Sequence, residues 1–252
     1  MKLGRLGAAV AIAASMLIGQ GASADANEIR VAVAANFTAA AKDIAAKFEE
    51  VTGDRAVLSF GSTGQLYTQI SQGAPFDVFL AADQARPEKA VQEGFAAVGS
   101  VFTYATGKIV LYSLDPNLVT GEETLSDGQF EKLAIANPET APYGAAAVQT
   151  MRALKVYDAL EPKLVQGNSI AQTYQFVASG SAELGFVALS QIIDQDGGSR
   201  WPVPQSLYDP IAQDAVLLTS AADNETAKDF LSFLRGDQAG QIIDRYGYGR
   251  GN

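Results

Sequence analysis

Residues 28–53 read EIRVAVAANFTAAAKDIAAKFEEVTG, and this stretch decides the fold class. Its first part, 28–35, is apolar and rich in β-branched residues, which predicts a buried strand. A short break at 36–38 follows, and apolar residues then recur at helical spacing until Gly53, a residue type that commonly ends a helix. A strand, a short loop and a helix in this order form the unit of an α/β protein.

The same unit recurs along the chain and indicates sheets with helices on both faces. Further strands are predicted at 55–60, 76–82, 108–114, 132–137, 163–167, 183–192 and 213–221. Two lobes, each with a mixed and mainly parallel sheet, fit the length better than one, with crossings after Gly107 and near Ala215. We therefore expect a first lobe made of residues 25–107 and 216–252, and a second made of residues 108–215.

The N-terminus has the pattern of an export signal. Lys2 and Arg5 precede an apolar run at 8–18, and residues 22–24 read Ala-Ser-Ala. The run is too short to span a bilayer, and the small residues fit a cleavage site. We expect residues 1–24 to be a cleavable signal peptide, and the mature chain to be periplasmic without membrane insertion.

The composition excludes several classes of function. The chain has 18 basic and 28 acidic residues; removing Lys2 and Arg5 leaves 16 basic residues and a charge of −12. A chain this acidic lacks the basic surface that binds nucleic acid. It also has no His and no Cys, which excludes Ser-His-Asp and Cys-His catalysis and the usual zinc sites. These absences favour a binding protein without a cofactor over an enzyme.

Four loops precede helices and share one character. They are AANFT at 34–38, FGSTG at 60–64, NPETAPYG at 137–144 and GNSI at 167–170, and none contains Lys or Arg. Unpaired amides at helix N-termini favour anions, and ligands of open α/β sheets bind beyond the carboxyl ends of strands. Neutral donors suit a fully deprotonated oxyanion, whereas hydrogen phosphate would bring an O–H that finds no acceptor.

Other interpretations of these residues exist. Asn and Thr before a helix are ordinary N-caps, and Gly-Ser is an ordinary turn. A hydrolase would use Ser62 with a lysine base, or paired carboxylates such as Asp77 and Asp83. We expect Asp83 to cap the next helix instead, and Asp77 to hold backbone amides. The sequence shows no repeats or linkers that would indicate an adhesion module.

Five stretches, in order, resemble one known family. They are VAVAANFTAAAKDIAAKFE, SFGSTGQLYTQISQGAPFDVFLAAD, KLAIANPETAPYGAAA, ELGFVALSQ and DRYGYG. The chain is similar over residues 28–248 to the periplasmic molybdate-binding proteins of ABC transporters. The resemblance implies the two-lobed fold of type II solute-binding proteins. It also implies a monomer that closes on one molybdate or tungstate dianion and delivers it to an inner-membrane permease.

The resemblance also implies the ligand-binding residues. Family positions fall on Asn36 with the Ala35 amide, on Ser62, on Tyr143 or the amides after it, and on the Ile170 amide. All of them would contact oxygens of the anion, with no direct bond between protein and molybdenum. Many family members carry a Tyr where this chain has Ala188, and the Tyr143 hydroxyl is expected to replace it.

Two alternatives within the same fold stay open. Sulfate is also fully deprotonated, so neutral donors do not distinguish a sulfate or other oxyanion binder from a molybdate binder. A ferric-iron binder would need several Tyr, His or carboxylate ligands together, which these loops do not supply.

Overall fold

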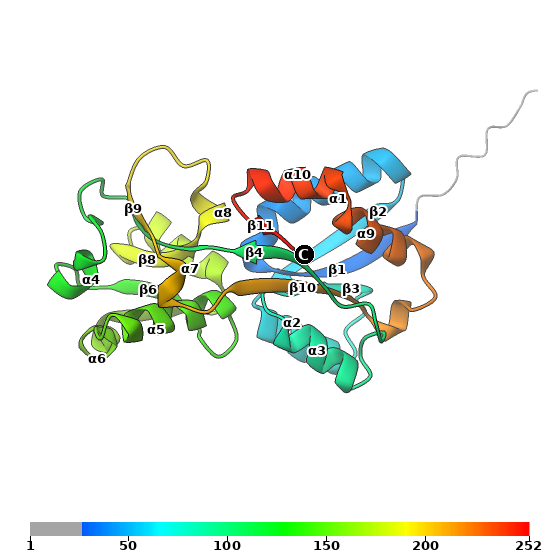
Figure 1. Ribbon diagram of the computed structural model, residues 1–252, viewed down its shortest axis with the longest axis horizontal. Helices are drawn as coiled ribbons and strands as arrows, with labels where there is room; N and C mark the ends of the chain where they lie inside the picture. The colour runs from blue at the N-terminus through cyan, green and yellow to red at the C-terminus, as the bar shows by residue number, and fades with distance from the viewer. Residues whose placement is uncertain (1–26, 252) are drawn as a thin grey trace, which may run out of the picture.

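The computed structural model describes residues 27–251 and contains two β-sheets flanked by helices (Figure 1). The predicted signal peptide at 1–24 lies outside the described residues. The first sheet has the strand order β11-β4-β10-β3-β1-β2. Its strands are β1 (Glu28–Ala34), β2 (Arg55–Gly61), β3 (Val78–Leu80), β4 (Phe102–Gly107), β10 (Ile211–Leu217) and β11 (Gly249–Arg250).

Helices cover both faces of the first sheet because β1 is apolar on both faces. Val31 and Val33 pack in the cluster that contains Phe48 and Phe230, whereas Ala32 packs in the cluster on the opposite face. In Figure 1, α1, α9 and α10 lie above this sheet, and α2 and α3 lie below it. These helices are α1 (Thr38–Thr52), α2 (Thr63–Ser71), α3 (Ala85–Gln92), α9 (Glu225–Arg235) and α10 (Asp237–Arg245). Helix α1 ends at Gly53, which has the positive φ of 80° that the sequence predicted from a glycine there.

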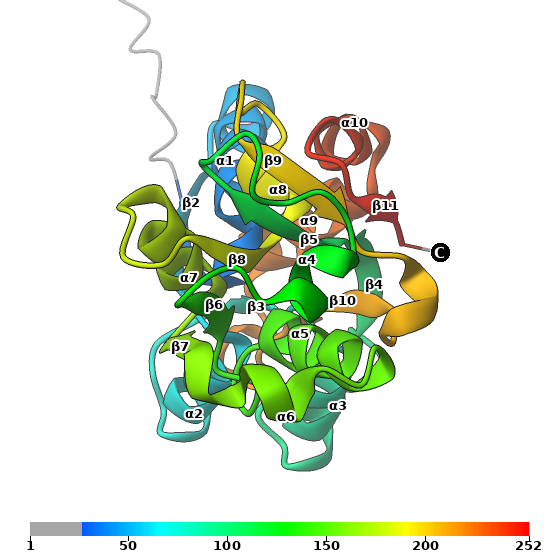
Figure 2. The same cartoon turned by 90° about the vertical axis from the view of Figure 1, so that its left-hand side faces the viewer.

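The second sheet has the strand order β7-β6-β8-β5-β9. Its strands are β5 (Ile109–Ser113), β6 (Leu133–Ala136), β7 (Leu164–Gly167), β8 (Leu184–Ala188) and β9 (Ser199–Pro202). Figure 2 looks onto this half of the molecule, with α5 and α6 below the sheet and α7 to its left. The helices are α4 (Glu123–Asp127), α5 (Pro142–Ala153), α6 (Tyr157–Leu160), α7 (Ile170–Ala178) and α8 (Leu189–Ile192). Short 3-10 turns lie at η1 (Ala35–Phe37), η2 (Glu161–Lys163), η3 (Gln205–Leu207) and η4 (Thr219–Ala221).

The predicted α/β class with two lobes is confirmed, but antiparallel pairing is more frequent than expected. Strand β1 pairs in parallel with β2 and β3, and β6 pairs in parallel with β7 and β8. Strands β10 and β5 instead pair antiparallel with both of their neighbours. The reason is the chain path, because the chain leaves the first sheet through β4, enters the second through β5 and returns through β10.

The crossings between the two sheets are short. Only Lys108 separates β4 from β5, although the two strands belong to different sheets. The returning strand β10 pairs with β4 from Ile211 onward. Residues 211–215 therefore already belong to the first sheet, although the expected boundary between the lobes was at residue 216.

One predicted strand ends earlier than the apolar pattern indicated. The strand predicted at 183–192 stops at Ala188, where the Ala188 amide donates to Gln191 Oε1 at 2.9 Å and the helix α8 begins. Helices α5 and α6 are separate because Lys155, which lies between them, has a φ of 60°. Strand β4 was not predicted, since its Thr and Gly residues interrupt the apolar pattern.

Candidate functional site

A small cavity lies between the two sheets, at the ends of their strands. Its volume is about 10 Å³. The residues that line it are Ala34, Ala35, Asn36, Ser62, Thr63, Ala82, Ala141, Pro142, Tyr143 and Ile170. All five residues predicted to bind a ligand are among them, and no lining residue is charged.

The sheet pairing explains why loops far apart in sequence meet here. Ala34 and Gly61 are partners at the ends of β1 and β2, and Ala136 and Gly167 are partners at the ends of β6 and β7. Parallel strands end at one edge of a sheet, so the loops that follow them lie side by side. Helices α2, α5 and α7 therefore begin at the cavity, and their first-turn amides have no acceptor within the helix.

Ser62 carries a hydroxyl without a partner. The residue is 3% exposed. Its Oγ is one of two buried side-chain nitrogen or oxygen atoms in residues 27–251 that make no hydrogen bond, and the other is Thr140 Oγ1. Ser62 occupies the N-cap position of α2 but does not cap the helix with its side chain. A buried hydroxyl without a partner costs about 1–3 kcal/mol. The side chain is therefore free to donate to a bound molecule.

Thr63, the next residue, was missed by the sequence analysis. It is 1% exposed and lines the cavity. Its Oγ1 accepts a hydrogen bond of 3.0 Å from the Ala82 amide, which joins the start of α2 to the end of β3. The accepting role leaves its own hydroxyl proton to be donated. Nothing in the sequence distinguishes it from Ser62 beside it.

Tyr143 places a phenol at the cavity from the second lobe. Its ring is 2% exposed, and its hydroxyl oxygen accepts from Gln213 Nε2 at 3.4 Å and from Asn36 Nδ2 at 3.5 Å. Burial raises the pKa of the Tyr143 phenol well above its usual value of 10.0. The hydroxyl therefore keeps its proton across the physiological pH range and can donate it.

The side chain of Asn36 is engaged by the protein. Its Nδ2 donates to Gln213 Oε1 at 2.9 Å and to the Tyr248 hydroxyl at 3.2 Å. The backbone carbonyl oxygen of Asn36 accepts from the Tyr248 hydroxyl at 2.7 Å and from Ser190 Oγ at 2.9 Å. The Nδ2 hydrogen bonds hold the carboxamide in the cavity wall, and its role as a ligand stays a prediction. The Asn36 backbone amide, in the first turn of η1, is the remaining donor of this residue.

Gln213 is the centre of this polar network, and the sequence analysis did not select it. It is fully buried in the returning strand β10, where Tyr104 donates its hydroxyl proton to Gln213 Oε1 at 3.1 Å. A buried polar side chain in an apolar strand needs partners. The sequence signal was the pair Gln213 and Asp214 inside the otherwise apolar β10.

Ile170 is the first residue of α7, and its side chain is 4% exposed. The preceding Ser169 uses its Oγ to accept from the Gln172 amide at 3.3 Å, so this hydroxyl caps the helix. Ala188 is buried at the end of β8 and is not among the residues that line the cavity. The second lobe therefore offers the Tyr143 hydroxyl and first-turn amides.

The carboxylates considered for catalysis have structural roles. Asp77 accepts the Arg30 amide at 2.6 Å, and Asp83 accepts the Arg86 amide at 3.0 Å and forms an ion pair with the Arg86 side chain. Within residues 27–251 no group of three or more Asp, Glu, His or Cys side chains could hold a metal ion. In the same range, no helix has the length and apolar content needed to cross a membrane.

Comparison with known proteins agrees with this arrangement. The family described as bacterial extracellular solute-binding protein matches residues 29–249. The molybdate-binding protein ModA of Rhodobacter capsulatus is 54% identical over 238 residues, which are 94% of either chain. The ModA protein of Azotobacter vinelandii is 53% identical over 244 residues, covering 95% of this chain and 96% of its own.

Solved structures give the same result. The periplasmic molybdate-binding protein of Azotobacter vinelandii superposes with a TM-score of 0.85 and 42% identity, over 88% of this chain and 98% of that one. The sulfate-binding protein SubI of Mycobacterium tuberculosis superposes with a TM-score of 0.73 at 12% identity, over 89% and 87%. The second likeness concerns the fold alone.

Proposed function

Because the chain belongs to the bacterial extracellular solute-binding protein family, we propose that it captures molybdate in the cavity between its two sheets. The observation that carries the proposal is the Ser62 hydroxyl, buried and without a partner in a cavity that has no charged lining residue. Such a donor favours a bound oxyanion. The relatives that are 54% and 53% identical, both named as molybdate-binding proteins, support molybdate as the anion.

In this proposal the anion is held by neutral donors from both lobes. The first lobe supplies the Ser62 hydroxyl and the amides of Ala35 and Asn36. The second supplies the Tyr143 hydroxyl and the Ile170 amide. Each hydrogen bond to a charged oxygen contributes about 1.5–3 kcal/mol, and the helix N-termini add about 0.3–2 kcal/mol each. The molybdenum atom needs no ligand from the protein, because it is already surrounded by its four oxygens.

Capture then requires motion of the lobes. The residues that would touch the anion are between 2% and 6% exposed, so a ligand reaches them only when the lobes separate. An anion that contacts both lobes stabilises the closed form by the contacts it lacks in the open form. We propose that the first lobe consists of residues 25–107 and of a C-terminal segment that begins near residue 211. The pairing of β10 with β4 from Ile211 onward favours this start over residue 216.

The remaining parts of the proposal follow from the family. We propose that residues 1–24 direct export, that the protein works in the periplasm as a monomer and that the loaded form delivers its anion to an inner-membrane ABC permease. We expect tungstate to bind as well, because it is a tetrahedral dianion of nearly the same size. The same neutral donors would accept sulfate only if the smaller anion could reach both lobes at once.

Isothermal titration calorimetry of the mature chain tests the proposal. Molybdate, tungstate, sulfate and phosphate are titrated separately at pH 7.5. Molybdate and tungstate should bind at least about 100-fold more tightly than sulfate, a difference of roughly 2.7 kcal/mol. Sulfate binding as tight as molybdate would instead identify a general oxyanion carrier, and no binding of any of the four would reject the anion site.

A further inference from the structure

Arg86 lies in α3 of the first lobe and reaches the second. Its Nη2 donates to the carbonyl oxygen of Glu139 at 2.6 Å. Its Nη1 forms an ion pair with the Asp83 carboxylate, which also accepts the Arg86 backbone amide at 3.0 Å. Asp83 therefore holds the guanidinium from its own lobe while the outer nitrogen bonds to the other lobe.

This contact is close to the cavity but does not line it. A Cβ added to Gly64, the second residue of α2, would lie 3.1 Å from Arg86 Nη2 and 3.0 Å from the Cα of Thr140. The Gly64 amide donates to the Thr140 carbonyl at 2.8 Å. Arg86 is therefore packed beside the helix start that presents Ser62, yet it is not among the lining residues.

We infer that Arg86 is a latch, a positioning residue that holds the lobes closed and slows release of the bound anion without touching it. The inference rests on the proposed function, because release presupposes a captured anion. Glu139 contributes a backbone carbonyl, so the latch depends on the closed arrangement of the two lobes and not on the side chain at 139. It is lost when the lobes separate.

The charge of the latch is balanced. The Arg86 and Asp83 side chains are 25% and 19% exposed, and their charges cancel within the pair. An arginine without an ion-pair partner at this place would attract any anion toward the cleft. It would thereby reduce the preference of the neutral donors for a fully deprotonated oxyanion. The pairing with Asp83 provides a strong donor for the lobe contact without adding net charge near the cavity.

The latch should affect the association and dissociation rate constants of the anion differently. An anion enters only the open form, so loss of the latch raises the association rate constant only by the factor by which the open fraction of ligand-free chains grows. This factor stays below 2 when fewer than half of the ligand-free chains are closed. Dissociation requires opening, and opening breaks the Arg86–Glu139 hydrogen bond. For a contact of this exposure, loss of the donor should raise the dissociation rate constant about 3- to 10-fold.

The test uses Arg86→Gln and Arg86→Lys in the mature chain. Stopped-flow fluorescence, with Trp201 and the tyrosines of the cleft as reporters, gives the association rate constant from the slope of observed rate against molybdate concentration. The intercept gives the dissociation rate constant. Arg86→Gln should raise the intercept 3- to 10-fold and change the slope less than 2-fold. Lysine has one ammonium group and no fork, so Arg86→Lys should fall between.

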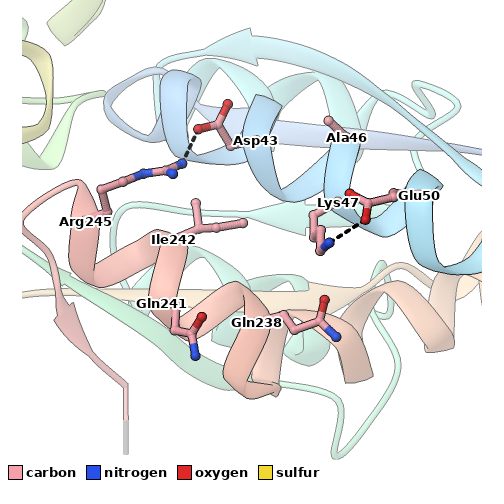
Figure 3. Close-up of a pocket in the computed structure, with 8 residues that line it drawn as sticks. All are labelled: Asp43, Ala46, Lys47, Glu50, Gln238, Gln241, Ile242 and Arg245. Carbon is pink, nitrogen blue, oxygen red and sulfur yellow. Dashed lines mark hydrogen bonds and ion pairs between the residues drawn. The ribbon is translucent and has the colours of Figure 1, made fainter.

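Two matched variants control for charge and for folding. Arg245→Gln removes an arginine whose ion pair with Asp43 stays within the first lobe, in the groove between α1 and α10 (Figure 3). Glu139→Ala removes the exposed side chain at 139 but keeps the carbonyl oxygen that accepts from Arg86. Both should release molybdate at the wild-type rate.

Small-angle scattering of the ligand-free chains separates failure of the latch from failure of the proposed function. The latch needs no anion, so Arg86→Gln should have a larger radius of gyration than wild type and Arg245→Gln. Equal radii together with equal dissociation rate constants would overturn the latch even if molybdate binds. If wild type binds no molybdate, the proposed function fails, and the scattering comparison alone decides on the latch.

Discussion

The Gly64 amide donates a hydrogen bond of 2.8 Å to the carbonyl oxygen of Thr140, and this bond joins the two lobes beside the cavity. The two backbone segments approach so closely because Gly64 has no side chain. A Cβ at this position would lie 3.0 Å from the Thr140 Cα, closer than real Cβ atoms normally approach. Closure of the lobes therefore depends on a glycine at the start of α2.

Gly64→Ala should weaken molybdate binding by about 1–3 kcal/mol, the usual cost of an overpacked contact. The added methyl group keeps the lobes apart by a few tenths of an ångström, so donors from the second lobe reach the anion poorly. Calorimetry measures the loss. Thermal unfolding of the ligand-free protein should change little, because each lobe keeps its own core. An unchanged affinity would mean that the lobes close with a different contact at this point.

Ser62→Ala should lower the affinity for molybdate by about 1.5–3 kcal/mol, because it removes a hydrogen bond to a charged oxygen. The same change should leave the stability of the ligand-free protein equal or slightly higher, since the wild-type hydroxyl is buried without a partner. Urea unfolding and calorimetry measure the two quantities.

Asn224→Ala is the matched control for Ser62→Ala. The Asn224 side chain caps α9, accepting from the Ala227 amide at 3.3 Å, and this helix takes no part in lining the cavity. Loss of the cap should cost about 0.5–2 kcal/mol of stability and leave molybdate affinity at the wild-type value. The two variants should thus show opposite patterns. Equal loss of stability in both would show that Ser62 has a structural role.

Gln213→Met should reduce both stability and affinity. The change keeps the volume of the side chain but removes the acceptor of Asn36 Nδ2 and of the Tyr104 hydroxyl. Each lost hydrogen bond costs about 0.5–1.5 kcal/mol, because Asn36 Nδ2 keeps the Tyr248 hydroxyl and the Tyr104 hydroxyl keeps the Ala81 carbonyl oxygen as acceptors. Urea unfolding should show the loss of stability, and calorimetry should show weaker molybdate binding because Asn36 is no longer braced. Wild-type values in both measurements would contradict the network described for β10.

Alkaline pH should destabilise the protein through its buried tyrosines. Burial raises the pKa of Tyr104, Tyr143 and Tyr248 above the usual 10.0. Above about pH 10 the unfolded state loses these protons while the folded state keeps them, so stability is full below pH 10 and falls as the pH rises. Each tyrosine should contribute about 1.4 kcal/mol per pH unit.

Urea unfolding of wild type and Tyr143→Phe between pH 9 and pH 11 measures this dependence. Above pH 10, the free energy of unfolding of the variant should fall less steeply than that of wild type, by about 1.4 kcal/mol per pH unit. Molybdate affinity of wild type should be flat from pH 7 to pH 9, because the Tyr143 phenol stays protonated. A fall in affinity across that range would mean that another group titrates at the site.

The sequence predicted the parts of the site that come from local order. Ser62, Tyr143 and Ile170 each lie at the start of a helix that follows a strand, so the strand-loop-helix pattern selected their loops. The resemblance to a known family then selected these residues within the loops. The structure brings them together with Asn36 and Ala35 around one cavity. Their roles as ligands stay predictions.

The parts that depend on the path between lobes could not be predicted. Gln213 and Tyr104 lie in strands that cross between the sheets, and Tyr248 comes from the end of the chain. Only the three-dimensional pairing brings them to Asn36. Arg86 was passed over because none of the four loops contains a cation, although helix α3 carries its side chain across to Glu139.

Gly107, at the end of the crossing strand β4, is in close contact with two residues of the candidate site. A Cβ at Gly107 would overlap the Tyr143 hydroxyl and lie 2.7 Å from Gln213 Nε2. The phenol from the second lobe thus lies against the backbone of the crossing strand. If the lobes turn about this strand in the proposed opening, the Tyr143 hydroxyl moves less than donors farther from the axis. We therefore expect it to be the last donor of the second lobe to leave the anion.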